Sequence, residues 1–207
     1  MIRRRIAAVF LAGCTGIFTG CATTTPPVSV LYSPSVGERG GSGDLFLKTS
    51  MGHADISQAN KVRWVIGSRK HSDGMATGEI LSTASAEDIV LEALKRELTA
   101  SGYRVQLGPT MPPGVHKGLE LSLVQVDVVE TDAVPRVEAT AEIKVSLQVW
   151  KNGVKTRKFS YGSRTSDFAI THRARLPREL IEKGLYEVMN QAVPDIVSVL
   201  EVKSELK

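Results

Sequence analysis

Two histidine–aspartate pairs are the residues whose spacing most resembles a metal or catalytic site. They are His53-Ala54-Asp55 and His71-Ser72-Asp73. Imidazole and carboxylate groups bind divalent metals, but these pairs lack partners at the distances that known sites use, and no two histidines lie four residues apart. We interpret both histidines, together with His116 and His172, as solvated loop residues. The sequence therefore predicts no metal site.

Sequence motifs for nucleophilic catalysis and for phosphate binding are also missing. The chain has no G-x-S-x-G elbow, no P-loop and no G-x-G-x-x-G fingerprint. The glycine-rich segment 40–43 precedes no predicted helix, so it offers no helix N-terminus to a phosphate. We expect a protein that is not an enzyme and binds no cofactor. An unrecognised hydrolase would need polar side chains from distant segments to converge in a cleft.

Clustered positive charge is the third chemical feature. Eight basic residues, offset by Asp167, lie in one segment: Lys151, Lys155, Arg157, Lys158, Arg164, Arg173, Arg175 and Arg178. The preceding predicted strands are acidic, so we favour cross-strand charge pairing over a binding role. The alternative is a surface that contacts lipid phosphates or an acidic partner protein. Its candidate residues are Lys155, Lys158, Arg164, Arg173 and Arg175.

The N-terminus predicts export from the cytoplasm. Three arginines, Arg3 to Arg5, precede an apolar run, Ile6 to Gly20, and a polar stretch follows. Fifteen helical residues reach only about 22 Å, too short for the hydrocarbon core of a bilayer, so we interpret residues 1–20 as a cleaved signal peptide.

The end of this run resembles the signals of bacterial lipoproteins, in which a small residue precedes a lipidated cysteine. Both Cys14 and Cys21 fit partly. We favour Cys21 because Cys14 leaves a short apolar run after Arg5. A disulfide is a weaker reading, since both cysteines lie within the signal or at its end. The resemblance implies a palmitate-type anchor on Cys21, and Ala22, in place of an inner-membrane-retaining Asp, implies the outer membrane.

Composition describes a globular protein that does not bind nucleic acid. The chain has 207 residues, of which 42% are hydrophobic and 23% charged, which excludes a disordered chain. Loss of the three signal arginines lowers the formal net charge from +4 to +1. The mature chain therefore lacks the excess of positive charge that is typical of nucleic-acid-binding domains.

Beyond Cys21 we predict a flexible tether, residues 21–44, and a single α+β periplasmic domain, residues 45–207. The tether is rich in Pro and Gly and is expected to bury no core. In the domain, Ser85 and Asp88 form a capping box that begins a helix, and Gly102 ends it. A second helix begins at Pro177, and Pro194 is expected to kink it.

Alternating polarity predicts the strands. Short strands are expected near 45–47, 62–66 and 103–107, and longer strands at 119–129 and 137–149, with a β-bulge near Val124. The order of elements implies a mainly antiparallel sheet with two helices packed on one face. A three-residue loop at residues 151–153 would pair Val145 with Phe159 and Ile143 with Tyr161, whereas a two-residue turn would turn both aromatic rings outward.

Part of the chain, 62–200, resembles the YajG-like family of bacterial lipoproteins. The resemblance rests on Cys21 with its Thr/Pro-rich tether, the helix end at 98–105, the Asn152-Gly153 hairpin and the final helix. It implies an outer-membrane anchor and supplies no catalytic residues.

These features lead to two main functional hypotheses. The first is a non-enzymatic lipoprotein on the periplasmic face of a Gram-negative outer membrane, which binds an envelope protein or anionic lipid. The second is an accessory protein for lipid or lipopolysaccharide transport and assembly, which needs an apolar groove. The oligomeric state and the binding partner cannot be read from the sequence.

Overall fold

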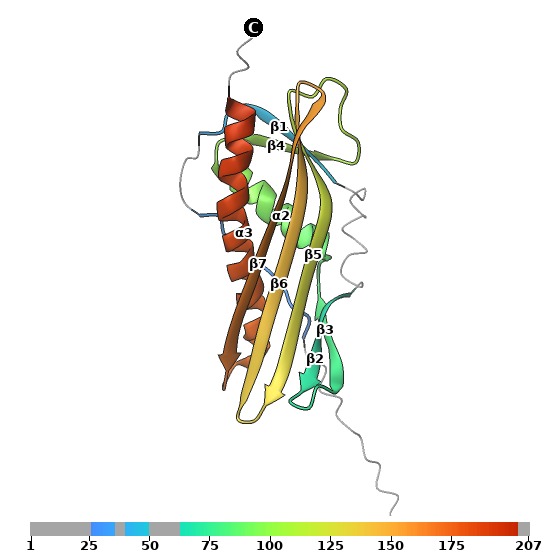
Figure 1. Ribbon diagram of the computed structural model, residues 1–207, viewed down its shortest axis with the longest axis vertical. Helices are drawn as coiled ribbons and strands as arrows, with labels where there is room; N and C mark the ends of the chain where they lie inside the picture. The colour runs from blue at the N-terminus through green and yellow to red at the C-terminus, as the bar shows by residue number, and fades with distance from the viewer. Residues whose placement is uncertain (1–25, 36–39, 50–62, 203–207) are drawn as a thin grey trace, which may run out of the picture.

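The elements of the structure, a computed structural model, form one mixed sheet and two long helices (Figure 1). The structure describes residues 26–35, 40–49 and 63–202. The predicted signal peptide, Cys21 and His53 lie outside the described residues. In chain order the elements are β1 (Asp44–Lys48), β2 (Trp64–His71), β3 (Ala76–Ser82), α2 (Ala86–Ala100), β4 (Arg104–Gly108), β5 (Lys117–Ala133), β6 (Arg136–Lys151), β7 (Val154–Ala169), the 3-10 turn η1 (Arg173–Arg175) and α3 (Leu176–Glu201).

Strands β5, β6 and β7 form a long antiparallel meander. The predicted alternation in β6 is confirmed, because every odd-numbered residue from Val137 to Val149 is buried. The predicted bulge is also confirmed: the ladder between β5 and β6 skips Ser122, two residues from the expected position. The meander therefore supplies one continuous apolar face.

The other edge of β5 pairs with two separate parallel strands. Its first residues pair with β1, and its last residues, Val128 to Asp132, pair with β2. Strand β4 lies parallel to β1, and β3 lies antiparallel to β2. The prediction of a mainly antiparallel sheet is confirmed only in part: the long ladders of the meander are antiparallel, but three of the six described strand pairs are parallel, so the sheet is mixed. Alternating polarity shows which face of a strand is buried, but not which strand lies beside it.

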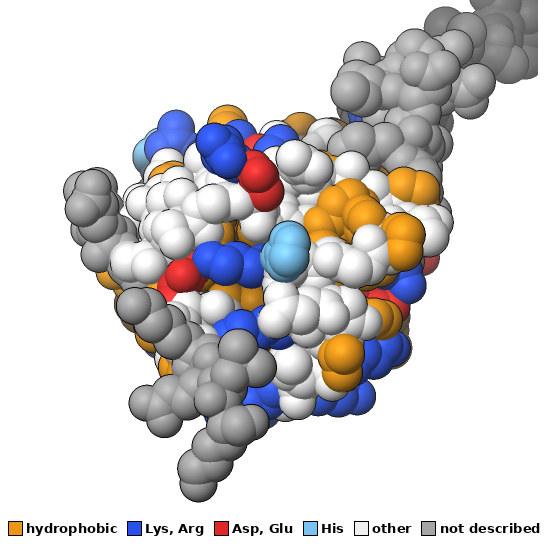
Figure 2. Space-filling model, turned by 90° about the horizontal axis from the view of Figure 1, so that it is seen from above, with side chains coloured by type: hydrophobic (Ala, Val, Ile, Leu, Met, Phe, Trp, Pro, Cys, Tyr) orange, Lys and Arg blue, Asp and Glu red, His pale blue; other side chains and the backbone are white. Residues whose placement is uncertain are grey.

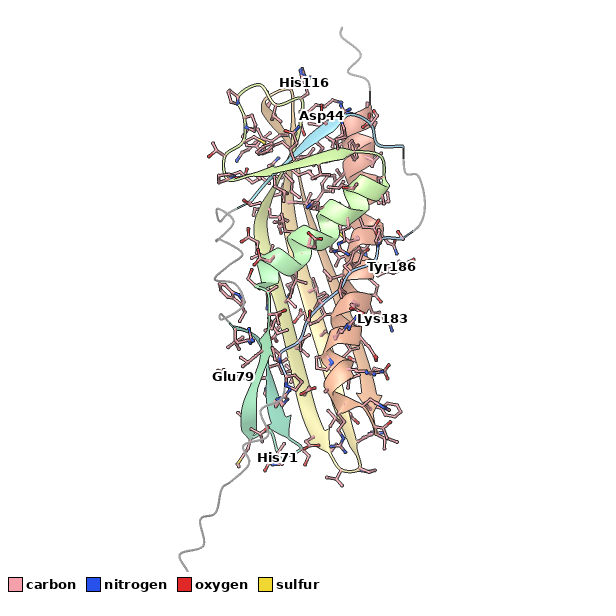
Figure 3. All side chains as sticks on the ribbon, turned by 180° about the vertical axis from the view of Figure 1, so that it is seen from behind. Asp44, His71, Glu79, His116, Lys183 and Tyr186 are labelled. Atoms are coloured by element: carbon pink, nitrogen blue, oxygen red, sulfur yellow. The ribbon has the colours of Figure 1, made fainter. Side chains whose placement is uncertain are left out.

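Both helices lie on the same side of the sheet, as predicted (Figure 3). Helix α3 packs against β6 and β7, and α2 packs against β4, β5 and α3. The expected apolar stripe of α3, from Leu180 to Ala192, is buried, and the helix continues through Pro194 to Glu201. No described helix is long and apolar enough to cross a membrane.

Local signals set both ends of α2. The Ser85 side chain accepts a hydrogen bond from the Asp88 backbone, and the Asp88 side chain accepts one from the Ser85 backbone. At the other end Gly102 adopts a φ of 105°, and Tyr103 N–H donates to Leu98 O over 3.1 Å. This is the Schellman arrangement that a left-handed glycine permits. The predicted capping box and glycine cap are confirmed.

The turn between β6 and β7 has two residues, so the predicted three-residue loop is wrong. Lys151 pairs with Val154 directly across it. Asn152 and Gly153 have φ values of 51° and 78°, as in a type I′ turn. This turn matches the right-handed twist of the flanking strands, which favours it over the longer loop.

A bulge in β7, rather than in the turn, decides where the aromatic rings point. The ladder between β6 and β7 skips Thr156, and beyond it Leu147 pairs with Phe159 and Val145 with Tyr161. Both predicted pairs are therefore wrong. The rings nevertheless pack against the core as expected, half-buried, because the extra residue restores the phase.

Residues 26–35, which we name the N-terminal strap, pack on the domain, so the flexible-tether prediction is wrong for them. Val28 and Tyr32 are buried, and Val28 bridges to Ser82 in parallel orientation. Val28 N–H donates to Leu81 O over 2.7 Å, and Thr83 N–H donates to Val28 O over 3.0 Å. Two large side chains separated by four residues thus bury apolar surface despite the prolines nearby.

A buried carboxylate of α2 holds the far end of the strap. Glu97 is fully buried and accepts hydrogen bonds from the Tyr32 hydroxyl at 2.5 Å and from Ser35 N–H at 2.8 Å. The strap also touches α3, where Leu31 N–H donates to Glu182 over 3.2 Å. It therefore links β3, α2 and α3.

Candidate functional site

The predicted basic surface residues are spread along the whole length of β7. Lys155 and Lys158 lie near the Asn152-Gly153 turn, Arg164 lies further along the strand, and Arg173 and Arg175 lie in η1, beyond its other end. A strand of this length spans roughly 50 Å. The structure therefore divides these residues between two ends of the molecule and does not bring all five together.

Most of the basic residues on the first part of β7 have partners within the chain. Lys155 lies 3.4 Å from Glu120 and over the Trp150 ring, 5.0 Å from its centroid. The Lys144 hydrogen bond, and to a smaller extent the Arg164 charge, lower the pKa of Glu142. Charge pairing, the reading favoured from sequence, accounts for Lys155 and in part for Arg164, whereas Lys158 has no carboxylate in ion-pair range within the described structure.

The other end of the sheet, which we name the β2–β3 end, holds a small pocket. This end comprises the turns at 72–75 and 134–135 and the segment 169–175, and Figure 3 labels His71 there. The pocket has a volume of about 300 Å³. Its lining comes from β2, β3, β5, β6 and η1 and consists of Arg69, Lys70, Thr77, Glu130, Asp132, Val137, Arg173 and Ala174.

Two ion pairs organise the pocket. Arg69 Nε lies 2.5 Å from Glu130, whose side chain is buried, and Arg173 lies 3.2 Å from Asp132. The Arg173 guanidinium also donates to Pro135 O over 2.8 Å. Within the described structure Lys70 has no carboxylate in ion-pair range. The arrangement presents hydrogen-bond donors to a small anionic or polar group.

The pocket lining combines carboxylates with guanidinium and ammonium groups and holds no nucleophile beside a base. Its lining contains no Cys, Ser or His, and Thr77 has no adjacent base among the lining residues. The described residues contain no cluster of three potential metal ligands. His116 Nδ1 lies 3.2 Å from Asn152 at the opposite end of the sheet, so His71 and His116 cannot share a site.

Two tyrosines outside the pocket have perturbed protonation equilibria. Burial raises the pKa of Tyr103 and of Tyr161, and the Tyr161 hydroxyl donates to Asp195 over 2.9 Å. Both hydroxyls therefore stay neutral across the physiological range. Tyr161 ties β7 to α3, which is a structural role.

The pocket was not predicted from the sequence, although the alternation of β5 indicates part of it. Beyond the bulge, Val126 and Val128 point inward, and the same period of two places Glu130 and Asp132 on that face. Acidic residues in phase with a core stripe could have indicated a buried polar site. Arg69 could not have been assigned to it, because the parallel pairing of β2 with β5 leaves no local signal.

No family model and no curated protein matches this chain. Solved structures that align with this chain include a Xanthomonas campestris protein of family DUF330, with 10% identity over 82% of this chain and 92% of that chain and a TM-score of 0.42. A minor lipoprotein from Acinetobacter baumannii has 16% identity over 64% and 90% of the two chains, with a TM-score of 0.40. Rare lipoprotein B from Shewanella oneidensis has 12% identity over 64% and 94%, with a TM-score of 0.38. The structural neighbours of this chain thus include bacterial lipoproteins.

Proposed function

We propose that this chain is a lipid-anchored, non-enzymatic binding protein on the periplasmic face of a bacterial outer membrane. The observation that carries the proposal is the apolar run of residues 6–20, which ends at Cys21, five residues before the strap joins the domain at Pro26. Two or three acyl chains on one cysteine give stable anchoring, which a single chain does not. The domain then binds another envelope component, a protein or an anionic lipid.

The polar pocket at the β2–β3 end supports binding as the activity. Its ion pairs, Arg69–Glu130 and Arg173–Asp132, hold the donors in fixed positions, and fixed donors favour recognition of a phosphate or carboxylate group. Such groups occur both on lipids and on acidic protein segments.

A role in carrying lipid acyl chains is the second candidate, and it receives less support. A carrier of acyl chains needs an apolar groove. Two cavities among the described residues, the pocket of the β2–β3 end and one between Arg136, Glu138 and Phe168, are each lined by several charged side chains. The apolar side chains between the sheet and the helices form one filled cluster.

The anchor is tested by mass spectrometry of the N-terminal peptide and by membrane fractionation. We expect an acylated Cys21 and recovery in the outer-membrane fraction. Cys21→Ser should leave the protein unacylated and release it from the membrane or stall its processing, whereas the matched Cys14→Ser variant should be acylated like the wild type. Acylation at Cys14 instead would contradict the assignment.

The membrane in which the protein resides is tested by one further substitution. Ala22→Asp should shift the acylated protein to the inner-membrane fraction, with Ala22→Ser as its control. Inner-membrane enrichment of the wild type would overturn the outer-membrane proposal.

A further inference from the structure

Large apolar side chains are exposed at each of the three chain turns of the β2–β3 end. Met75 precedes β3, Val134 lies between β5 and β6, and Phe168 and Ile170 lie at the end of β7. Their exposed fractions are 64%, 91%, 54% and 60%. Water-exposed apolar groups that gather at one point of a surface mark a contact with a partner or a membrane.

The sheet register brings these turns side by side. His71 pairs with Asp132, Asp132 with Val137, and Val137 with Ala169, so the ends of β2, β5, β6 and β7 lie in one row. The Arg136 guanidinium lies 5.4 Å from the centroid of the Phe168 ring. The four apolar residues therefore lie at one end of the sheet, whose turns and strand ends are at the bottom of Figure 1.

The path of the strap directs its first described residue, Pro26, toward this same end. Val28 runs parallel to β3 at Ser82, so Pro26 lies back toward Ala76, about 14 Å from it along the strand. Five residues connect Pro26 to Cys21 and reach at most about 18 Å. A lipid on Cys21 can therefore lie just beyond the β2–β3 end, whereas the Asn152-Gly153 turn lies too far away.

We infer that the β2–β3 end rests on the membrane that holds the anchor, with Met75, Val134, Phe168 and Ile170 among the lipid headgroups. This inference rests on the proposed anchoring of Cys21. Lys70 and Arg175, which have no carboxylate in ion-pair range within the described structure, face the lipid phosphates. Nearby carboxylates, Asp73, Asp132 and Asp167, nearly balance the charge of this end. Apolar insertion dominates, so the contact needs no strongly anionic lipid and depends little on salt.

Depth-dependent fluorescence quenching tests this orientation. The full-length acylated protein is reconstituted into vesicles of phosphatidylethanolamine and phosphatidylglycerol, with an environment-sensitive dye on Val134→Cys or, as the matched control, on Val154→Cys. Both positions are highly exposed, so neither substitution disturbs the core. We expect brominated lipids to quench the dye at 134 several-fold more strongly than the dye at 154, at both low and high salt.

A second set of variants separates apolar insertion from mere proximity. Met75→Ser, Phe168→Ser and Ile170→Ser together should reduce quenching at 134 to the level seen at 154. The control combination, Leu31→Ser, Leu123→Ser and Tyr186→Ser, removes exposed apolar groups elsewhere and should leave quenching at 134 unchanged.

The outcomes separate the two proposals. An unacylated Cys21 in the mass spectrum would refute the anchor itself. Two results with an acylated protein would overturn the membrane contact and leave the anchor intact. In the first, the dyes at 134 and 154 are quenched equally. In the second, a second copy of the chain or a protein partner, instead of lipid, protects the dye at 134.

Discussion

The two ends of the sheet use similar residues in opposite ways. At the end formed by the β6–β7 turn with β1 and β4, which we name the hairpin end, lysines bind groups of their own chain. Lys117 lies 2.6 Å from Glu201 and 2.7 Å from Ser42 O, and Lys151 donates to the carbonyls of Val199 and Val202. Figure 2 looks down on this end, where basic, apolar and uncharged side chains are interspersed.

At the β2–β3 end, part of the charge and the apolar surface lack a partner within the described chain. Arg173 still pairs with Asp132, but Lys70 and Arg175 have no carboxylate in ion-pair range within the described structure, and three turns expose apolar side chains. The hairpin end also exposes Val154 and Val202, but Lys117 and Lys151 there bind groups of their own chain. The β2–β3 end differs in that four exposed apolar side chains gather beside basic residues that have no ion-pair partner in the described structure. A run of basic residues in the sequence does not reveal this difference, because the difference depends on which side chains the fold brings beside them.

The strap is the element whose loss should affect the molecule most. Tyr32→Ala removes a buried ring and the shortest of the hydroxyl hydrogen bonds to Glu97, so we expect a loss of about 3–5 kcal/mol in unfolding free energy by chemical denaturation. Leu31→Ala, at an exposed neighbour, should cost less than about 0.5 kcal/mol. Equal small effects would mean that the strap is a free tether, and the N-terminal tail would then not be held near the β2–β3 end.

Alanine substitution of two phenylalanines of β7 compares the stability contribution of the packed part of the strand with that of the β2–β3 end. Phe159 is half-buried, with its ring 5.9 Å from that of Tyr161, so Phe159→Ala should lower the unfolding free energy by about 1–2 kcal/mol. Phe168→Ala should change stability by less than about 0.5 kcal/mol. A large destabilisation by Phe168→Ala would show that this ring belongs to the core and not to a contact surface.

The tight turn of the hairpin end should tolerate glycine but not a branched residue. Gly153 has a positive φ, and a Cβ there would lie 3.3 Å from Gly114 Cα. We expect Gly153→Val to cost about 1–2 kcal/mol in thermal or chemical unfolding. Asn152→Gly, at the other left-handed position, should be nearly neutral, and a neutral Gly153→Val would argue for a longer loop.

Acidification should loosen the hairpin end. The Lys48 hydrogen bond, 2.5 Å long, holds the pKa of Glu120 below its usual value, although burial opposes the shift. Because the folded-state pKa is depressed, this pair stabilises the fold at neutral pH and is lost as pH falls through the folded-state value. Glu120→Gln should therefore flatten the decline of stability below about pH 4.5, by less than about 1 kcal/mol. If the unfolding free energy of Glu120→Gln declined with falling pH as steeply as that of the wild type, the Lys48–Glu120 pair would contribute nothing to stability.

Local rules predicted much of the fold, and long-range pairing accounts for most of what they missed. Ser85 and Gly102 act within a few residues, so they located both ends of α2 from sequence. The phase of β6 followed from its alternation in the same way. The parallel pairing of β2 and β1 with β5, and the burial of Tyr32 against Glu97, join segments more than 50 residues apart and leave no local pattern.

In the candidate site, too, local features could be predicted from the sequence and long-range contacts could not. The sequence analysis recognised the basic residues Arg173 and Arg175, but it grouped them with Lys155 and Lys158, which the 16-residue strand β7 separates from them. Glu130 was recognisable from its phase, whereas its partner Arg69 comes from a distant strand. Residue type was therefore predictable, and spatial grouping was not.

Hydrogen–deuterium exchange on the membrane-anchored protein tests the difference between the two ends most directly. The acylated protein in vesicles is compared with the soluble mature domain of Cys21→Ser, peptide by peptide. The account predicts slower exchange on anchoring at the β2–β3 end, in residues 72–75, 133–136 and 169–175, and no change at the hairpin end, in residues 109–116 and 151–154. Protection at the hairpin end, or at neither end, would contradict it.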